Sequence, residues 1–379
     1  MSSETIPRSL ALKAGELVEV RSREEILTTL DKNGCLDNLP FMPEMLAFCG
    51  QQLRVYKRAH KTCDTVKYSG SQRIANAVHL EGIRCNGQEH GGCQAECLIF
   101  WKEAWVKRAS VLPVTGKSAT LGRKAVDSAP NNSSCTEADV LANACKTDGD
   151  MASDPVYTCQ ATQMLQAGPL LRWWDLRQYW EDYTSGNFSL KWMFGVMCYA
   201  TFSALMNLRR GRIQSALNRL YNAIQKARGR PCHPRAAGRV PDGTRTPTVN
   251  LNLQPGEMVR VKSFDAIRDT LNSRCRNRGL YWDAELVPYC GGEFRVRSRV
   301  KQVIDERTGK MLHLKSEPLI LEGAFCQAKY SEHRYFCPRS TFSFWSEIWL
   351  ERIGQESPRP PAANAEANPP EEPMRAMSR

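Results

Sequence analysis

The chain has 379 residues, of which 42% are hydrophobic and 24% are charged, and its formal net charge is +12. This length is more than one ordinary core needs, and the composition excludes an intrinsically disordered chain, so we expect two or three globular domains. The first residues, Met1 to Arg8, contain no apolar run of the signal-peptide type, and we therefore expect a cytoplasmic protein.

Fifteen cysteines in a chain that is expected to be cytoplasmic argue against a disulfide scaffold. They favour metal ligands together with some buried thiols. This inference depends on the compartment, because disulfides persist only in oxidising surroundings.

Two segments of the chain match each other in register. Leu12–Ser22 matches Leu253–Ser263 at an offset of 241 residues. Cysteines and tryptophans further along also match, at offset 241 for Cys49 and Cys290 and for Cys85 and Cys326, and at offset 244 for Cys93 and Cys337, Trp101 and Trp345, and Trp105 and Trp349. A register held over so long a span indicates a tandem duplication. We therefore expect two modules, at residues 10–109 and 251–353.

Each module is expected to be rich in short strands. Leu17 to Val20 alternates as a half-buried strand does, and short helical patterns follow at residues 23–30 and 264–271. Other alternating segments also predict strands: residues 52–58, 77–83, 293–300 and 318–325. Asp305-Glu-Arg-Thr-Gly309 is typical of a hairpin turn. The predicted fold class is α+β, with two small SH3-like barrels or rolls flanking a helical middle.

The expected connecting segments are a flexible linker at 110–154, a helical middle segment at 155–230, a basic linker at 231–250 and a disordered tail at 354–379. Residues 192–208 are uncharged and mostly apolar, but about seventeen residues are fewer than the ~20 of a membrane span. A span would also put the matched thiols in different redox compartments. We expect a buried helix here, with contact at a membrane surface as the alternative.

Positive charge is concentrated between Arg209 and Arg245, where ten Lys or Arg stand against one acid, Asp242. Such a block attracts phosphate polymers, acidic polysaccharides or anionic lipid headgroups. The alternative is a solvated helix face followed by a basic linker. The candidate anion-binding residues are Arg209, Arg210, Arg212, Arg219, Lys226, Arg228 and Arg230.

Candidate metal ligands occur in both modules. Zinc takes about four thiolate or imidazole ligands in a tetrahedron, and closely spaced Cys and His in glycine-rich loops provide them. The candidates in the first module are Cys63, Cys85, His90, Cys93 and Cys97, of which we favour the four thiols, with His90 as a substitute. The candidates in the second module are Cys290, Cys326, His333 and Cys337.

The two ligand sets differ, because Cys63 is matched by Ile304 and no thiol matches Cys97. We therefore expect the first module to be the better metal site. An iron–sulfur cluster in that module is the alternative to zinc. Buried free thiols are a third interpretation, and it suits Cys49 and Cys290, which end apolar runs.

Cys93 follows His90 closely and is a candidate nucleophile. Its match with Cys337, which lies in a setting without glycines, favours a structural ligand instead. The tryptophans at 101 and 105, and at 345 and 349, have i, i+4 spacing, which indicates one face of a helix packed on the barrel, or an exposed platform for sugars or bases. We find no phosphate-binding glycine loop, Ser/His/Asp set or Rossmann fingerprint.

Several motifs resemble those of a group of uncharacterised bacterial proteins. In the first module these are Phe48-Cys-Gly, Arg58-Ala-His-Lys-Thr-Cys63, Val78-His-Leu-Glu-Gly-Ile-Arg-Cys85, His90-Gly-Gly-Cys-Gln-Ala-Glu-Cys97 and Phe100-Trp-Lys-Glu-Ala-Trp105. In the second they are Tyr289-Cys-Gly-Gly-Glu-Phe-Arg-Val296 through Asp305-Glu-Arg-Thr-Gly-Lys-Met311. The resemblance covers both modules and is weaker between them. It implies a bacterial, family-wide architecture and no particular chemistry.

The sequence thus predicts a zinc-stabilised, non-catalytic binding or scaffold protein. Its expected partner is nucleic acid or another anionic polymer, or a protein, bound through the basic segment. An iron–sulfur or redox enzyme and a membrane-peripheral accessory protein are the alternatives.

Overall fold

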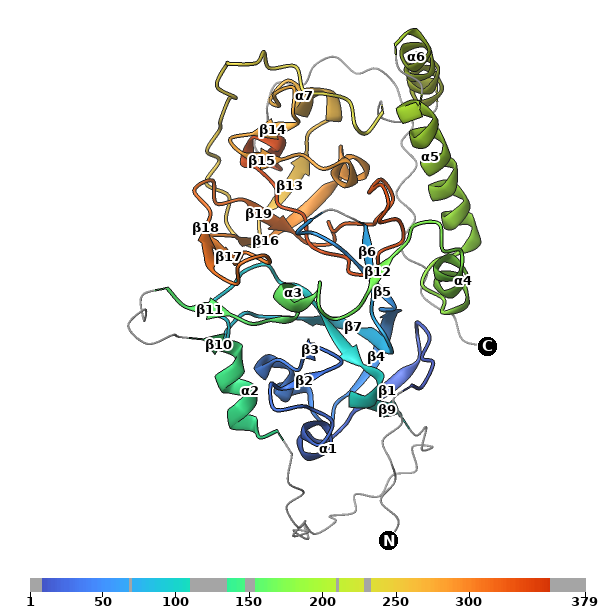
Figure 1. The fold of residues 1–379 in the computed structure, drawn as a ribbon. Coiled ribbons are helices and arrows are strands. Elements are labelled where there is room, and N and C mark those ends of the chain that lie inside the picture. The colour runs from blue at the N-terminus through green and yellow to red at the C-terminus, as the bar shows by residue number, and fades with distance from the viewer. Residues whose placement is uncertain are drawn as a thin grey trace.

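The computed structural model describes residues 9–67, 70–109, 135–146, 154–208, 211–227 and 233–354. They form an α+β structure in which two β-rich modules lie against each other, with helices along one side (Figure 1). The expected tail beyond Gly354, and the linker between residues 110 and 134, lie outside the described residues.

The helices are α1 (Arg23–Leu27), α2 (Glu137–Ala144), α3 (Gln160–Gln163), α4 (Arg177–Thr184), α5 (Leu190–Leu208), α6 (Arg212–Ala227) and α7 (Phe264–Arg268), with 3-10 helices η1 (Pro43–Phe48), η2 (Glu103–Trp105), η3 (Ala284–Tyr289) and η4 (Glu347–Trp349). The strands up to residue 171 are β1 (Leu17–Val20), β2 (Cys35–Leu36), β3 (Leu39–Pro40), β4 (Gln52–Arg58), β5 (Lys61–Cys63), β6 (Ser71–Arg73), β7 (Ala77–Arg84), β8 (Leu98–Lys102), β9 (Val106–Arg108), β10 (Cys145–Lys146), β11 (Val156–Tyr157) and β12 (Leu170–Leu171). The strands after residue 250 are β13 (Met258–Val261), β14 (Arg276–Asn277), β15 (Leu280–Tyr281), β16 (Glu293–Arg299), β17 (Gln302–Ile304), β18 (Met311–His313), β19 (Leu319–Leu321) and β20 (Leu350–Arg352).

The two modules contain antiparallel sheets in which four matched strands have the same order, and the first sheet has β8 as an additional edge strand. In the first module the order is β8-β7-β4-β1-β9, and in the second it is β19-β16-β13-β20. Leu17 pairs with Arg54, and Met258, 241 positions after Leu17, pairs with Arg295. The register shifts at matched places in both sheets, between Val55 and Lys57 and between Val296 and Ser298. The hairpin expected around residues 305–309 is confirmed by the pairing of β17 with β18.

Each module has its own core around a matched pair of buried tryptophans, and the second core adds Trp282 where the first has Phe41. Trp105 Nε1 donates a hydrogen bond to Thr29 Oγ1, and Trp349 Nε1 donates one to Thr270 Oγ1, each at 3.1 Å. The expectation of a helix face is wrong, because Trp101 belongs to strand β8 and Trp105 to the short 3-10 helix η2. The burial of both side chains removes the exposed platform as an interpretation.

A buried glutamate holds the first residues of each module in place. Glu103 accepts hydrogen bonds from the backbone N–H groups of residues 10, 11 and 12 and from Arg58 at 2.8 Å. Glu347 accepts hydrogen bonds from the N–H groups of residues 251, 252 and 253 and from Arg299 at 2.5 Å. A carboxylate with several donors satisfies buried backbone groups that would otherwise lose their water.

Residues 135–146 and 154–171 pack on the first module and differ from the expected linker and helical segment. Thr136 caps α2 through a capping box with Asp139, and Val140 on this helix is buried in the first core. Strand β12 then pairs with β6 of the first module. The short element β11 also reaches the second module, where the Tyr157 N–H donates to the carbonyl oxygen of Gly309 at 2.8 Å.

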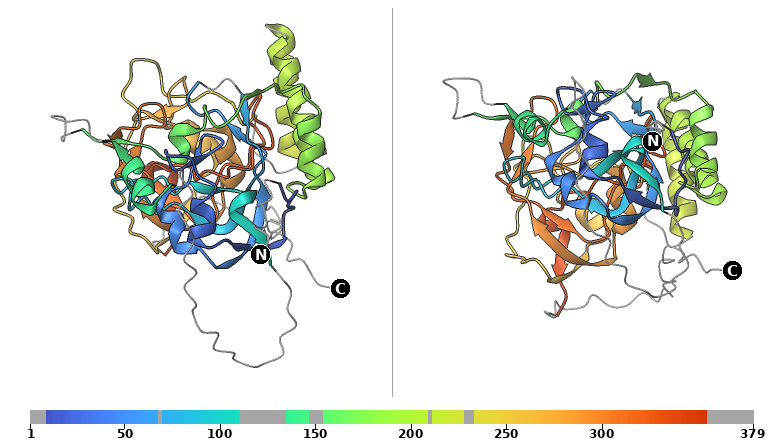
Figure 2. Two further views of the ribbon diagram at one scale, coloured as in Figure 1. Left: turned by 60° about the horizontal axis from the view of Figure 1, so that its bottom comes forward. Right: turned by 90° about the horizontal axis from the view of Figure 1, so that it is seen from below.

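Helices α4, α5 and α6 form a helical arm, which lies at one side of the two modules in all three views (Figures 1 and 2). Its base is fixed by a buried ion pair between Lys61 Nζ and Asp182 Oδ2 at 2.6 Å. The expected buried helix is only partly buried, because Phe194 on α5 is 74% exposed. Among the described residues, no helix has the length and apolar character needed to cross a membrane.

The contacts between the modules are reciprocal. In the first matched pair of contacts, the Cys63 N–H donates to Cys337 Sγ (3.2 Å) and the Ile304 N–H donates to Cys93 Sγ (3.4 Å). In the second pair, Tyr56 contacts Ser340 (3.4 Å) and Arg297 contacts Glu96 (2.5 Å). In each pair, both residues of one contact match those of the other, with the modules exchanged. Thr65 and Glu306, which are themselves matched, hydrogen bond to each other. Reciprocity of this kind is the property of an interface with approximate two-fold symmetry.

Candidate metal centres

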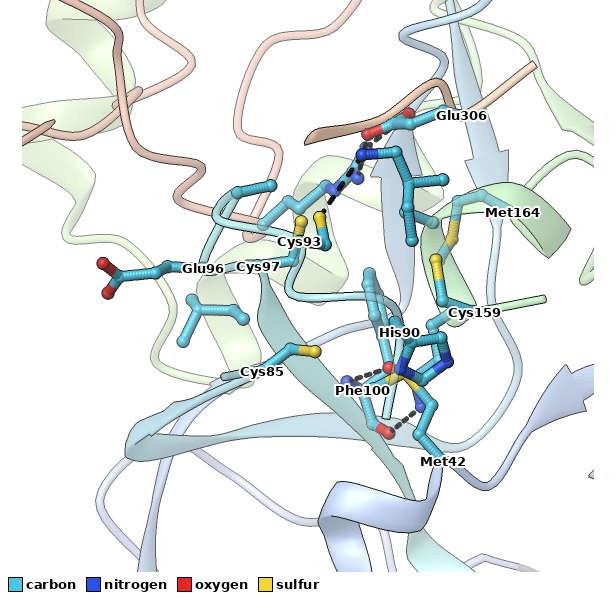
Figure 3. Close-up of a pocket in the computed structure, with 16 residues that line it drawn as sticks. Met42, Cys85, His90, Cys93, Glu96, Cys97, Phe100, Cys159, Met164 and Glu306 are labelled. Atoms are coloured by element: carbon cyan, nitrogen blue, oxygen red, sulfur yellow. Dashed lines mark hydrogen bonds and ion pairs between the residues drawn. The ribbon is translucent and has the colours of Figure 1, made fainter. Parts of the chain in front are cut away.

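The first cavity is lined by cysteines that the sequence singled out and has a volume of about 40 Å³. Cys85, Cys93 and Cys97 line it from the first module, and we call these three the first cluster. Figure 3 shows the sulfurs of Cys93 and Cys97 side by side, while the Cys85 sulfur lies apart from them and is directed toward His90. Because a water molecule needs roughly 10–15 Å³ of such space, the cavity suits an ion or a few waters and excludes an organic substrate.

The loop that carries this cluster folds back on itself. Gly87 has φ +68°, and a Cβ atom there would lie 2.0 Å from the carbonyl oxygen of Cys93. The Cys85 N–H donates to the carbonyl oxygen of Cys97 at 2.9 Å, which joins the two ends of the loop. Glycine at position 87 is therefore a condition for bringing the three thiols together.

The second module closes the first cavity with an ion pair. Arg339 is buried and pairs with Glu306 at 2.6 Å. Burial raises the pKa of the Cys97 thiol, and the neighbouring Arg339 guanidinium acts in the opposite direction. A metal ion must displace the protons of such thiols, and a nearby cation favours the thiolate.

His90 is held by two hydrogen bonds. Its Nδ1 lies 2.6 Å from a Glu44 carboxylate oxygen, and its Nε2 donates to the carbonyl oxygen of Thr158 at 3.1 Å. Burial opposes ionisation of Glu44, but the hydrogen bond to His90, the charge of His90 and two nearby backbone N–H groups together hold the pKa of Glu44 below its usual range. Both ring nitrogens of His90 are therefore engaged, whereas the second carboxylate oxygen of Glu44, Oε2, is buried without a hydrogen-bond partner among the described residues.

The group with the shortest mutual distances is Glu44, Cys85 and His90. Among the described residues it alone brings three or more potential ligand atoms within 4.8 Å of one another. For His90 to coordinate a metal ion, one of its two hydrogen bonds must break. Cys93 Sγ accepts a hydrogen bond from the Ile304 N–H, which a thiolate ligand can keep, and we therefore regard Cys93 and Cys97 as the better ligands to join Cys85.

A second cavity, of about 340 Å³, is lined by Cys63, Cys326 and Cys337, which we call the second cluster. Cys63 comes from β5 of the first module and the other two come from the second module. A hydrogen bond from the Cys63 thiol, together with the Cys63 N–H, lowers the pKa of Cys337 to about 7, although burial opposes this. The structure therefore places Cys63 with the thiols of the second module and not with Cys93 and Cys97.

The remaining predicted ligands lie apart from both clusters. Cys290 ends η3 and packs against the second core. His333 is exposed, and its ring contacts Trp173 at a centroid distance of 5.6 Å. Neither residue lines the first or the second cavity.

Of the candidate anion-binding residues, Arg219 and Lys226 are exposed on α6. Arg209, Arg210, Arg228 and Arg230 lie outside the described residues, and the side chain of Arg212 is likewise not described. The expected apolar stripe of α6 is not covered, because Leu220 is 59% exposed and Ile224 is 45% exposed.

The sequence interpretation missed two residues: Cys159, which lines the first cavity, and Glu44, which lies beside Cys85 and His90. Cys159, at the start of α3, lines the cavity, and burial raises its pKa to about 12. Glu44, matched by Glu285, was visible as a repeated carboxylate, and this was the available signal. Cys159 has no match in the repeat, so only the packing of α3 reveals its place.

Comparison of the chain with protein-family models, with curated proteins and with solved structures gives no match. The arguments for function therefore rest on the residues and their geometry.

Proposed function

We propose that the protein is a zinc-stabilised, non-catalytic binding protein built from two SH3-like modules that arose by tandem duplication. The matched strand registers, glutamate anchors and tryptophan hydrogen bonds support the duplication. The observation that carries the metal is the first cluster, in which Cys85, Cys93 and Cys97 line one cavity of about 40 Å³. Zinc ligated by thiolates would further stabilise the loop between residues 85 and 97.

The helical arm is the proposed binding surface. It exposes apolar side chains at Leu190, Phe194, Met197, Leu205, Leu220 and Ile224. Arg219 and Lys226 add exposed positive charge on the same arm. A bare polyanion would neutralise the charges but leave the apolar side chains in water, so these side chains favour a protein partner with acidic residues.

Elemental analysis of protein purified without oxygen tests the metal. We expect zinc and a colourless protein, and a metal-free, fully folded protein would contradict the proposal. For the arm, Phe194→Ser with Leu220→Ser is expected to remove a partner that copurifies with the unaltered chain. Leu312→Ser, an exposed leucine of the second module, is the matched control and should retain that partner. Retention on heparin that is lost in Arg219→Ser with Lys226→Ser would instead indicate a polyanion.

A second candidate is an iron–sulfur protein, because Cys159 gives the first cavity a fourth thiol beside Cys85, Cys93 and Cys97. Four cysteines are the usual ligand set of such a cluster. Iron with sulfide and visible absorption would establish it. The membrane-peripheral alternative rests on the exposed side chains of α5, such as Phe194, and flotation with anionic liposomes tests it.

A further inference from the structure

We infer that Cys63, Cys326 and Cys337 form a second metal site, which is assembled from both modules and binds zinc through three thiolates. All three residues line the second cavity. The Cys63 N–H donates to Cys337 Sγ at 3.2 Å, which fixes β5 of the first module against the second. This inference does not depend on the first cluster, because the two sets share no residue.

The two clusters occupy matched positions. Cys85 and Cys93 of the first cluster match Cys326 and Cys337 of the second. The backbone agrees with this match, since the Cys85 N–H donates to the carbonyl oxygen of Cys97 at 2.9 Å and the Cys326 N–H donates to that of Thr341 at 2.8 Å.

The third thiol differs in its origin. In the first cluster it is Cys97 of the same module, and its match in the second cluster is Thr341. In the second cluster it is Cys63 of the other module, and its match is Ile304, whose N–H donates to Cys93 Sγ. The two clusters thus differ at two matched positions, and each cluster has a thiol at one of them and another side chain at the other. Each cluster therefore contains three thiols. Two metal sites would require this number, whereas two ordinary cores would not.

The surroundings of the second cluster suit a metal ion with one exchangeable ligand. Cys63 and Cys337 are in direct contact through the Cys63 N–H, and Cys326 lines the same cavity. Glu285 cannot be the fourth ligand without loss, because it accepts hydrogen bonds from Lys329, Tyr330 and Ser331. A water molecule or a small anion from the cavity of about 340 Å³ is the natural fourth ligand.

Two features allow the three sulfurs to close around a zinc ion. The sulfurs need to converge further than they do here, and rotation about the Cα–Cβ bond moves a cysteine sulfur without moving the backbone. Zinc with three thiolates carries a net charge of −1, and Arg334 at the cavity wall and buried Arg339 lie near Cys63 to offset it.

The test is the metal content of the full chain, purified reduced and loaded with Zn²⁺ or Co²⁺. We expect two ions in the unaltered chain, one in Cys63→Ser, one in Cys97→Ser and none in the double variant. Cys198→Ser, an exposed cysteine of α5, is the control and should keep both ions. A single ion that is lost in Cys63→Ser and kept in Cys97→Ser would uphold the second site and remove the first.

The inference is overturned if Cys63→Ser leaves the metal content unchanged. It is also overturned if each single variant binds one ion and the double variant, Cys63→Ser with Cys97→Ser, still binds one. A Cys63–Cys337 disulfide in the reduced, metal-loaded protein, detected by mass spectrometry, would also overturn it. Because a serine variant can fail to fold, Thr341→Cys provides a gain of function. It should add a fourth thiolate to the second site, with stronger sulfur-to-Co²⁺ charge-transfer absorption and slower loss to a chelator. An unchanged spectrum would contradict the site.

Discussion

The first and the second cluster differ in what must be folded before each exists. Cys85, Cys93 and Cys97 lie within thirteen residues of the first module, whereas Cys63 is separated from Cys326 and Cys337 by most of the chain. A metal ion bound at the first cluster would stabilise one loop. A metal ion bound at the second would stabilise the contact between modules, because its ligands come together only when the modules pack. Matched positions would therefore stabilise a single loop in the first cluster and the contact between the modules in the second.

The largest expected effect is that of metal removal. Chelation under reducing conditions should lower the unfolding free energy by up to about 10 kcal/mol per site, as for structural zinc. In Cys63→Ser we expect two unfolding transitions in place of one, because the modules lose their shared ligand set. In Cys97→Ser we expect a single transition at lower temperature. Calorimetry distinguishes the two, and identical thermograms for both variants would remove the proposed difference between the clusters.

The ion pair at the base of the helical arm comes next. Lys61 is fully buried and pairs with Asp182, while the matched Gln302 donates its hydrogen bonds to the carbonyl oxygens of Gly91 and Gly92. Lys61→Met should cost roughly 3–5 kcal/mol because it leaves a buried carboxylate without its partner. Gln302→Met should cost about 1–2 kcal/mol.

The double variant Lys61→Met with Asp182→Leu is the control for the ion pair, and in denaturant unfolding it should recover much of the loss. An equal loss of unfolding free energy in Lys61→Met and Gln302→Met would show that the buried charge of Lys61 makes no difference between the two matched positions.

The two anchoring glutamates should differ slightly. Glu103→Gln is expected to cost about 3 kcal/mol and Glu347→Gln about 2 kcal/mol, because each amide turns one acceptor into a donor that faces backbone N–H groups. Glu103 is fully buried and Glu347 is 9% exposed, so water relieves the second more easily. Chemical denaturation measures both, and a larger cost at Glu347 would contradict the comparison.

The smallest effect at pH 7 belongs to a buried histidine, which makes the first module sensitive to acid at one matched pair. His79 is buried where the second module has Ile320, and burial lowers its pKa to about 3. The unfolded state therefore binds a proton below pH 6.5 that the folded state does not bind until about pH 3. Stability at neutral pH is lost as the pH falls through this range, by at most about 1.4 kcal/mol per pH unit.

His79→Ile, which copies the second module, should reduce this slope and change stability at pH 7 by about 1 kcal/mol or less. Unfolding of both proteins between pH 4 and 7 provides the measurement. Equal slopes would mean that His79 is already protonated in the folded protein.

The sequence predicted those features that depend on local pattern or on the repeat. The strands around Leu17 and Met258 and the hairpin at residues 305–309 follow from alternation and turn residues. The i, i+4 spacing of Trp101 and Trp105 led to the wrong prediction of a helix. A strand followed by a short 3-10 helix also brings both side chains into the core. Helix α2 was missed although its capping box, Thr136 to Asp139, is visible in the sequence.

The candidate sites show a different limit. The spacing of Cys85, Cys93 and Cys97 was enough to group them, because a short loop allows few arrangements. Cys63 was assigned to the same group, since nearness along the chain says nothing of which module a strand faces. Its true neighbours could be found only from the packing of one module on the other.

The contact between Thr65 and Glu306 has a consequence for how such a molecule differs from a homodimer. In a pair of identical subunits, a residue on the symmetry axis meets its own copy, so a carboxylate there would face a carboxylate and a threonine a threonine. A fused chain has no such obligation, and here a hydroxyl faces an acid. Under the proposed duplication, the same freedom would allow Lys61 to pair with Asp182 of α4 while the matched Gln302 donates to two backbone carbonyl oxygens of the first module. Covalent linkage thus lets each half specialise while the axis that joins them is kept.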